Sequence, residues 1–263
     1  MILSMNGDSG ANGDPISSRG AVESWAGQNL YCPNCTSAKL DLQNNSELSC
    51  PRCHLLFTVK GQKTRLGKSV ADGAYDATMR ALRSDNGPGY YFVHYDDASW
   101  AVRNVLLVPH FALPPSAIIK RAGSAGCRFA LDRVPPDARI AIVTTIKSSK
   151  SGDTECIMIS RPEEVRERFH RLKPLADIPA KQRALTLDVL NLVRTLAAAK
   201  PKKKNPKSPP GTFTNENVYA RESEFRKGHR EISNLRDKIR RQLQVLKDCG
   251  FLTQPHPGVW KMR

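Results

Sequence analysis

Three short runs in the first half of the chain have the alternating or fully apolar character of strands. They read "YYFVHYD" at 90–96, "WAVRNVLLVP" at 100–109 and "RIAIVTTI" at 139–146. β-Branched and aromatic residues dominate these runs, as is typical of strands. Helical spacing with several alanines predicts a helix over 72–84, and a proline followed by two acids predicts the start of another over 161–172. We therefore expect one α/β domain over 25–180.

The second half of the chain has a helical period instead. Residues 184–200 are strongly apolar at helical spacing, and the segments 212–228 and 233–250 are predicted to form two further helices. The closing "FLTQPHPGVWKMR" predicts two short strands around a Pro-Gly turn. Three helices followed by a β-hairpin is the order of a winged helix-turn-helix, which we place at 181–263.

Two segments have the composition of chain that does not pack. Residues 1–24 contain much Gly, Ser, Asn and Asp and little apolar material, which predicts a disordered N-terminal tail. The run "KPKKKNPKSPPG" at 200–211 predicts an exposed basic loop, which could contact phosphates without reading a sequence.

The net charge says more about the partner of this protein than the rest of its composition does. The formal net charge of +16 favours a polyanionic partner, because each Lys or Arg placed at a phosphate releases condensed counterions. No apolar run reaches the ~18 residues that a membrane span needs. The N-terminus lacks the basic start and apolar stretch of a secretory signal, and seven cysteines without such a signal favour a reducing compartment. We expect a cytoplasmic protein that binds nucleic acid and no membrane.

The cysteines supply the clearest chemical motif. Cys32 and Cys35 form one Cys-x-x-Cys pair, and Cys50 and Cys53 form a second. Two such pairs at this separation are typical of a four-thiolate zinc site, and four protein ligands leave no position for water. The sequence therefore predicts a structural Zn²⁺ in a small module over 32–53. Three further cysteines are expected to be buried apolar residues: Cys127, Cys156 and Cys249.

A short strand is predicted directly after the second pair, in "HLLFTVKG". Strand alternation puts Phe57 and Val59 on one face and Thr58 and Lys60 on the other. Glu47 could reach the second face if the zinc turn folds the ribbon back. A carboxylate beside a lysine is found in magnesium nucleases, where acids hold the ion and the lysine orients water or phosphate. A lysine at a strand end is also a common solvated edge residue.

The last predicted helix carries candidate DNA contacts. Its inward stripe is Leu235, Ile239, Leu243 and Leu246, and Ser233 or Asn234 could cap its start. The polar side chains then lie elsewhere on the helix, with those near its N-terminus best placed to enter a major groove. Arginine can bind guanine, and Gln or Asn can bind adenine. The candidate DNA-binding residues are Asn234, Arg236, Lys238, Arg240, Arg241 and Gln244; a solvated basic face is the alternative.

Several blocks, in order, resemble the DpnI-like methyl-directed restriction endonucleases and the related Dam-replacing proteins. These blocks are "LYCPNC", the Cys-Pro-x-Cys…Phe-x-x-Lys segment at 50–60, "DGAYDATMRALRSDNGP", "VLLVPHFALPPSAIIKR", "FTNENVYARESEF" and "LRDKIRRQLQVLKDCGFL". The resemblance extends from Trp25 to the end of the chain. It implies a PD-(D/E)xK-type nuclease domain with an embedded zinc module, followed by a winged helix. It also implies Mg²⁺-dependent cleavage of double-stranded DNA at GATC carrying N6-methyladenine.

The resemblance assigns the catalytic positions to Glu47, Thr58 and Lys60. Glu47 matches the family's first acid and Lys60 its lysine, but Thr58 stands where the family has its second acid. Mg²⁺ prefers anionic oxygen, so the loss of one carboxylate is expected to weaken the site. Asp41 or Asp72 could supply a substitute carboxylate, and the sequence favours neither.

Two functions therefore remain open, with a third less favoured. The first is a type II restriction endonuclease that acts on adenine-methylated DNA as a monomer. The second is a relative without nuclease activity that binds methylated DNA through its winged helix. A zinc-ribbon transcription regulator is less favoured, because it gives no purpose to the blocks of the nuclease domain.

Overall fold

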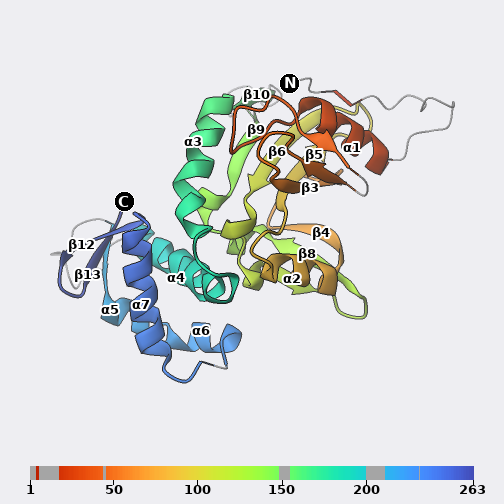
Figure 1. The fold of residues 1–263 in the computed structure, drawn as a ribbon. Coiled ribbons are helices and arrows are strands. Elements are labelled where there is room, and N and C mark those ends of the chain that lie inside the picture. The colour runs from red at the N-terminus through yellow and green to blue at the C-terminus, as the bar shows by residue number, and fades with distance from the viewer. Residues whose placement is uncertain (1–3, 6–17, 44–45, 148–154, 200–210, 231) are drawn as a thin grey trace.

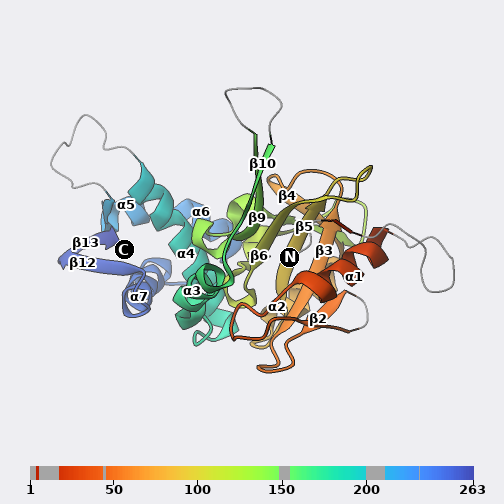
Figure 2. The same ribbon diagram turned by 90° about the horizontal axis from the view of Figure 1, so that it is seen from above.

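A seven-stranded mixed sheet forms the centre of the N-terminal part of the protein (Figures 1 and 2). The computed structural model describes residues 4–5, 18–43, 46–147, 155–199, 211–230 and 232–263. In sheet order the strands are β1 (Asp41–Leu42), β2 (Glu47–Ser49), β3 (Leu56–Gln62), β5 (Gly89–Tyr95), β6 (Val102–Val108), β9 (Ile140–Lys147) and β10 (Glu155–Ile159). Only the β3–β5 pair is parallel among these neighbours. The three strands predicted from apolar runs are β5, β6 and β9.

A second sheet of three strands covers one face of the large sheet. Its order is β4 (Ser69–Ala74), β8 (Gly126–Ala130) and β7 (Ile118–Lys120), and α2 (Tyr75–Arg83) follows β4. Phe129 of β8 packs against Tyr90 and Phe92 of β5, with ring centroids 4.8 Å and 5.1 Å away. The short 3₁₀ helices of this region are η1 (His110–Ala112), η2 (Pro115–Ala117), η3 (Leu131–Arg133) and η4 (Pro136–Ala138). The helix predicted over 72–84 is confirmed for 75–83 as α2, whereas its first three residues belong to β4, which pairs with β8.

Helix α1 (Ser18–Asn29) packs on the opposite face of the large sheet, over β3. A Cβ on Gly61 would lie 2.6 Å from the Val22 side chain, so only glycine lets the helix approach so closely. The Tyr91 hydroxyl donates a hydrogen bond of 2.9 Å to the carbonyl of Tyr31, just after the helix. The disordered tail predicted for 1–24 is therefore wrong for 18–24, because apolar side chains of this segment are buried against the sheet.

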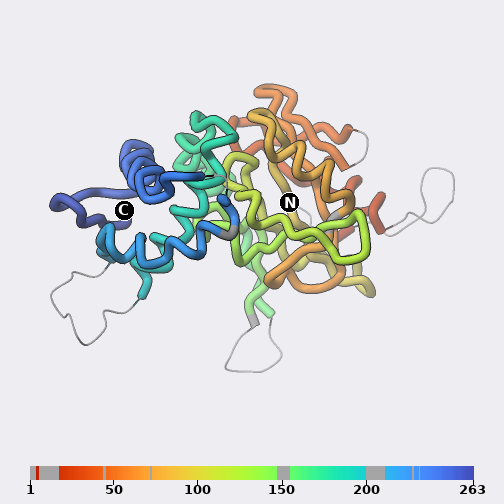
Figure 3. The backbone as a smooth tube through the Cα atoms, turned by 90° about the horizontal axis from the view of Figure 1, so that it is seen from below, coloured from red at the N-terminus to blue at the C-terminus, as the bar shows by residue number. Residues whose placement is uncertain are grey.

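Helix α3 (Pro162–Leu172) and the short η5 (Lys173–Leu175) connect the sheet to the C-terminal part (Figure 3). The predicted helix over 161–172 is confirmed. The C-terminal elements are α4 (Ala180–Ala198), β11 (Thr212–Thr214), α5 (Asn215–Tyr219), α6 (Glu222–Gly228), α7 (Leu235–Asp248), β12 (Leu252–His256) and β13 (Val259–Met262). Strand β13 lies between β11 and β12 in a three-stranded sheet. No helix in the described ranges combines the length and apolar character needed to cross a membrane.

The single helix predicted for 212–228 is wrong, because this segment forms a strand and two short helices. Phe213 of β11 pairs with Trp260 of β13, which holds the start of the segment extended. Thr214 then caps α5: its hydroxyl accepts the backbone N–H of Asn217, and the Asn217 side chain accepts the N–H of Thr214. The predicted basic loop at 200–211 falls almost entirely outside the described residues.

The three cysteines outside the predicted zinc module differ in exposure. Cys127 is buried and Cys249 is half-buried, in line with the expectation of apolar packing. Cys156 is exposed, which corrects the expectation. The reason is its place on β10, the edge strand of the large sheet, whose five residues are all exposed.

Candidate functional site

The four predicted zinc ligands come together in the structure. Their sulfur atoms all lie within 4.8 Å of one another, with Cys32 and Cys53 at 3.5 Å and Cys35 and Cys50 at 3.4 Å. A tetrahedral Zn²⁺ with Zn–S bonds of ≈2.3 Å separates its sulfurs by ~3.8 Å, so the cluster has the size of a four-thiolate site. Within the described residues this is the only group of three or more His, Cys, Asp or Glu that could hold a metal.

Backbone groups stabilise the charged form of the cysteines. The N–H groups of Asn34 and Ser37 point at the sulfurs of Cys32 and Cys35 at 3.4 Å and 3.5 Å. Burial nevertheless raises the pKa of both of these thiols. Burial also raises the pKa of the Cys50 thiol, but hydrogen bonds from the N–H groups of Cys53 and Arg52, together with those to neighbouring sulfurs, outweigh it and lower the pKa to about 7. A thiolate is the species that binds metal, so the turn at Cys50 favours coordination.

Helix α3 fixes the cysteine cluster to the rest of the protein. Arg166 donates from Nε to the carbonyl of Cys35 at 2.8 Å, and its guanidinium lies over the Tyr31 ring at 5.4 Å. His170 makes a hydrogen bond of 2.8 Å with the carbonyl of Asn34. The cysteine module is therefore held by side chains far away in the sequence as well as by its own turns.

The three predicted catalytic residues lie on one face of the large sheet. Glu47 is directly opposite Thr58 in the antiparallel β2–β3 pair, and Lys60 follows two residues later on the same face. The second cysteine pair turns the ribbon back, as the sequence suggested. Glu47 is exposed, Lys60 is half-buried and Thr58 is only 9% exposed. The position where the family has its second acid is thus occupied by the almost buried side chain of Thr58.

A cavity of about 380 Å³ lies beside Lys60, between β3, β4 and the start of α1. Glu23 of α1 lines it and accepts hydrogen bonds from Ser46 and, at 2.7 Å, from Arg19. Burial raises the pKa of the Glu23 carboxyl, but these two hydrogen bonds outweigh it and hold the pKa below its ordinary value. Ser46 faces α1, whereas Glu47 beside it shares the face of Thr58. Glu23 and Glu47 therefore approach the strand from opposite sides.

The two alternative acids differ in their distance from this cavity. Asp41 lies on β1 opposite Ser49, two strands away from Lys60. Asp72 lies on β4, between two residues that line the cavity, Ala71 and Gly73, and its side chain is outside the described part. The described side chains thus supply one carboxylate on the face of Lys60, and they do not fit a magnesium site that needs two.

Helix α7 presents the predicted DNA contacts on its exposed side. The inward stripe is confirmed, because Leu235, Ile239, Leu243 and Leu246 are all buried. Asn234 occupies the N-cap position, but its side chain does not cap the helix. The other candidates, Arg236, Lys238, Arg240, Arg241 and Gln244, are all exposed.

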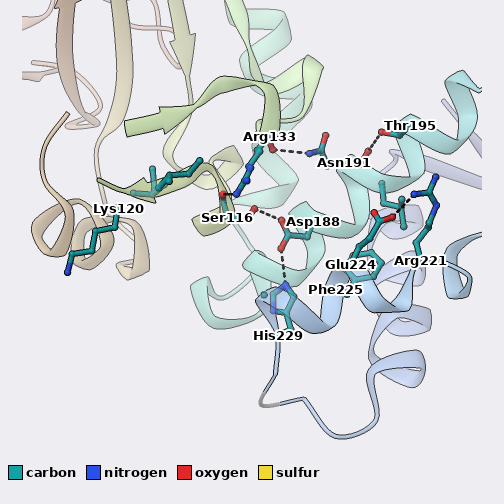
Figure 4. A pocket seen from close by; sticks show the side chains of 14 residues that line it. Ser116, Lys120, Arg133, Asp188, Asn191, Thr195, Arg221, Glu224, Phe225 and His229 are labelled. Carbon is teal, nitrogen blue, oxygen red and sulfur yellow. Dashed lines mark hydrogen bonds and ion pairs between the residues drawn. The ribbon is translucent and has the colours of Figure 1, made fainter. Parts of the chain in front are cut away.

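A cavity of about 810 Å³ lies where the two parts of the protein meet (Figure 4). At its centre Asp188 of α4 accepts a hydrogen bond of 2.6 Å from Ser116 of η2 and contacts His229, after α6, at 2.8 Å. The aspartate lies between the serine and the histidine, so the histidine does not touch the serine hydroxyl as a catalytic base must. This cluster joins the two parts. No motif in the sequence indicates this cluster, because its members come from three distant segments.

The structure defines a mixed α/β domain with four cysteines close enough together to hold a metal ion, followed by a domain of the helix-turn-helix type. Comparison with protein-family models agrees: the model of DpnI, the Dam-replacing family, matches residues 12–161, and the Dam-replacing HTH domain matches residues 181–262. The chain belongs to the Dam-replacing family. Membership of this family implies a methyl-directed restriction endonuclease that binds DNA.

Proposed function

We propose that the protein is an endonuclease of the PD-(D/E)xK type that hydrolyses double-stranded DNA at adenine-methylated GATC. The observation that carries this proposal is the placement of Glu47 opposite Thr58 and beside Lys60 on one sheet face. Zn²⁺ on the four cysteines would fix the turns on either side of β2. The Mg²⁺ that the family implies for cleavage would need a second carboxylate besides Glu47, which Asp72 could supply. The nuclease domain would span 25–180 and a winged helix 181–263, as a monomer.

The side chains on this face would have separate tasks. The Lys60 ammonium would bind the scissile phosphate and stabilise the negative charge that builds up on it during hydrolysis. The Glu47 carboxylate, exposed at the start of β2, would orient a water molecule for attack on phosphorus. A zinc ion with four thiolate ligands has no free position for water, so it would take no part in the chemistry.

A second function is favoured by one observation, the nearly buried hydroxyl of Thr58 in place of a carboxylate. With one described carboxylate on the face of Lys60, the chain would bind methylated DNA through α7 and cut it slowly or not at all. Asp72, whose neighbours line the cavity beside Lys60, is the first substitute acid to test.

Cleavage of adenine-methylated and unmethylated GATC plasmid, with Mg²⁺ or Mn²⁺, separates the two functions. For an active enzyme we expect cutting of methylated plasmid only, and a loss of roughly 10²–10³-fold in rate for Lys60→Ala. Asp72→Asn should abolish cutting if Asp72 replaces the missing acid. A native chain that binds methylated DNA without cutting, and that cuts after Thr58→Glu, would establish the second function. Failure to bind methylated DNA would contradict both.

A further inference from the structure

Arg236, the first arginine of the proposed DNA-reading helix α7, is held in place by two neighbouring side chains. Its Nε donates to Glu222 Oε2 of α6 at 2.7 Å. Its guanidinium also lies over the ring of Tyr219, at the end of α5, 5.7 Å from the ring centre. The side chain is nevertheless 66% exposed. One edge of the guanidinium is thus held by the protein while the rest is presented outward.

Glu222 is itself fixed by a second arginine. Its other carboxylate oxygen, Oε1, accepts a hydrogen bond of 2.9 Å from Arg226, one helical turn further along α6. The side chain of Glu222 is only 20% exposed, and the two arginines lower the pKa of its carboxyl below the ordinary value. The carboxylate therefore stays ionised and has one orientation, which makes it a rigid support for Arg236.

The geometry leaves the terminal amino groups of Arg236 available for a partner. Among the described residues the hydrogen bond to Glu222 uses Nε, and none is made by Nη1 or Nη2. Two parallel N–H donors on one edge match the O6 and N7 acceptors of guanine in the major groove. Arg240 and Gln244 follow Arg236 at intervals of four residues, so the three side chains lie along one exposed line of α7.

A lysine or an unsupported arginine would behave differently. A long cationic side chain without a partner contacts any phosphate within reach, and such contacts carry no sequence information. A fixed carboxylate beside the arginine repels phosphate and holds the guanidinium in one plane. Both effects favour a base edge over the DNA backbone, in a chain whose net charge of +16 already favours binding of any DNA.

We propose that Glu222, assisted by Tyr219, is a specificity-determining residue that positions Arg236 to bind a guanine of the recognition site. This proposal rests on the proposed function, because it assigns the reading of duplex DNA to α7. Glu222 acts through Arg236 and does not itself contact a base. Its removal should have two opposite effects: weaker binding of the specific site and stronger binding of unrelated DNA.

The test compares Glu222→Gln with Glu224→Gln in the full-length chain. Glu224 lies on the same helix and pairs with Arg221, so its substitution removes the same charge without touching α7. Dissociation constants are measured by fluorescence anisotropy at one salt concentration, for methylated GATC, for the same duplex with 7-deazaguanine, and for an unrelated duplex. The 7-deaza base lacks the N7 acceptor and leaves the methyl group in place.

For the native chain we expect 7-deazaguanine to weaken binding by roughly 10-fold, at the lower end of what a bidentate contact contributes, because one of its two hydrogen bonds is lost. Glu222→Gln should bind the specific site about as weakly as the native chain binds the 7-deaza duplex. It should also bind unrelated DNA several-fold more tightly and no longer distinguish the two guanine duplexes. Arg236→Lys keeps the charge but not the paired donors, and should lose the same discrimination. Glu224→Gln should keep it.

Equal discrimination by Glu222→Gln and the native chain would overturn the inference, as would native binding that does not respond to 7-deazaguanine. Identical changes in Glu222→Gln and Glu224→Gln would also overturn it, because they would reduce the effect to bulk charge. In these cases preferential binding of methylated GATC would leave the proposed function intact. A native chain without any preference for methylated GATC would contradict the proposed function as well, so the two failures are distinguishable.

Discussion

The cysteine cluster and the proposed catalytic residues of β2 and β3 are adjacent in the sequence, yet the two sites differ in how complete they are in the structure. The cluster takes all four ligands from 32–53 and brings them within 4.8 Å. On the neighbouring sheet face Lys60 of β3 and Glu47 of β2 lie together, but Thr58 stands where the proposed nuclease would need a second carboxylate. The comparison shows that all four cysteines of a structural metal site can be in place beside a sheet face that lacks one side chain needed for the proposed cleavage.

Loss of a zinc ligand should have the largest effect. Structural zinc contributes about 10–16 kcal/mol in zinc-finger peptides, as much as the whole stability of a typical domain, about 5–15 kcal/mol. We therefore expect Cys50→Ser to lose zinc and to unfold the 32–53 module, with loss of DNA cleavage. Metal analysis and circular dichroism check this. Cys156→Ser, on the exposed edge strand, is the control and should keep one zinc per chain. A folded Cys50→Ser protein without metal would contradict the zinc assignment.

A smaller effect is expected at the joint between the two domains, which is assembled from distant segments of the chain, unlike the cysteine cluster. Asp188→Asn removes the charge that both Ser116 and His229 contact. Hydrogen bonds to charged groups contribute about 1.5–3 kcal/mol, so the free energy of unfolding should fall by about that amount. Urea denaturation measures the loss. Asp237→Asn makes the same change of charge at an exposed position of α7 and should leave stability within about 0.5 kcal/mol. Equal stability of the two variants would show that the joint is not stabilising.

The smallest effect is a pH dependence at the cavity beside Lys60. The pKa of Glu23 is lowered in the folded protein from its ordinary value of 4.5. Its stabilising contribution is therefore present above pH 4.5 and lost as the pH falls through the folded pKa. Glu23 is partly exposed, so this contribution should stay below about 1 kcal/mol. Thermal melting of Glu23→Gln should show a smaller loss of stability than the native chain between pH 5 and pH 3. Equal losses of stability in the two proteins over this pH range would show that the Glu23 carboxylate does not stabilise the fold through Arg19 and Ser46.

Features that depend on neighbours in the sequence could be predicted, and features that depend on distant partners could not. The spacing of Cys32, Cys35, Cys50 and Cys53 was sufficient for the cluster, and apolar runs were sufficient for β5, β6 and β9. The small β4–β8–β7 sheet was missed, because its strands carry Gly, Ser and Arg and are held by pairing. The support of Arg236 by Glu222, fourteen residues earlier, was missed for the same reason.

The contact between Arg166 and the carbonyl of Cys35 joins residues that are 131 positions apart. The ligands 32–53 can bind metal as soon as they leave the ribosome, whereas α3 can dock only after more than a hundred further residues have been made. If the cysteines bind Zn²⁺ during synthesis, the 32–53 module would be complete before α3 exists and would offer a surface on which α3 later packs. Since α4 follows α3, we expect the packing of α3 to precede that of the helix-turn-helix domain.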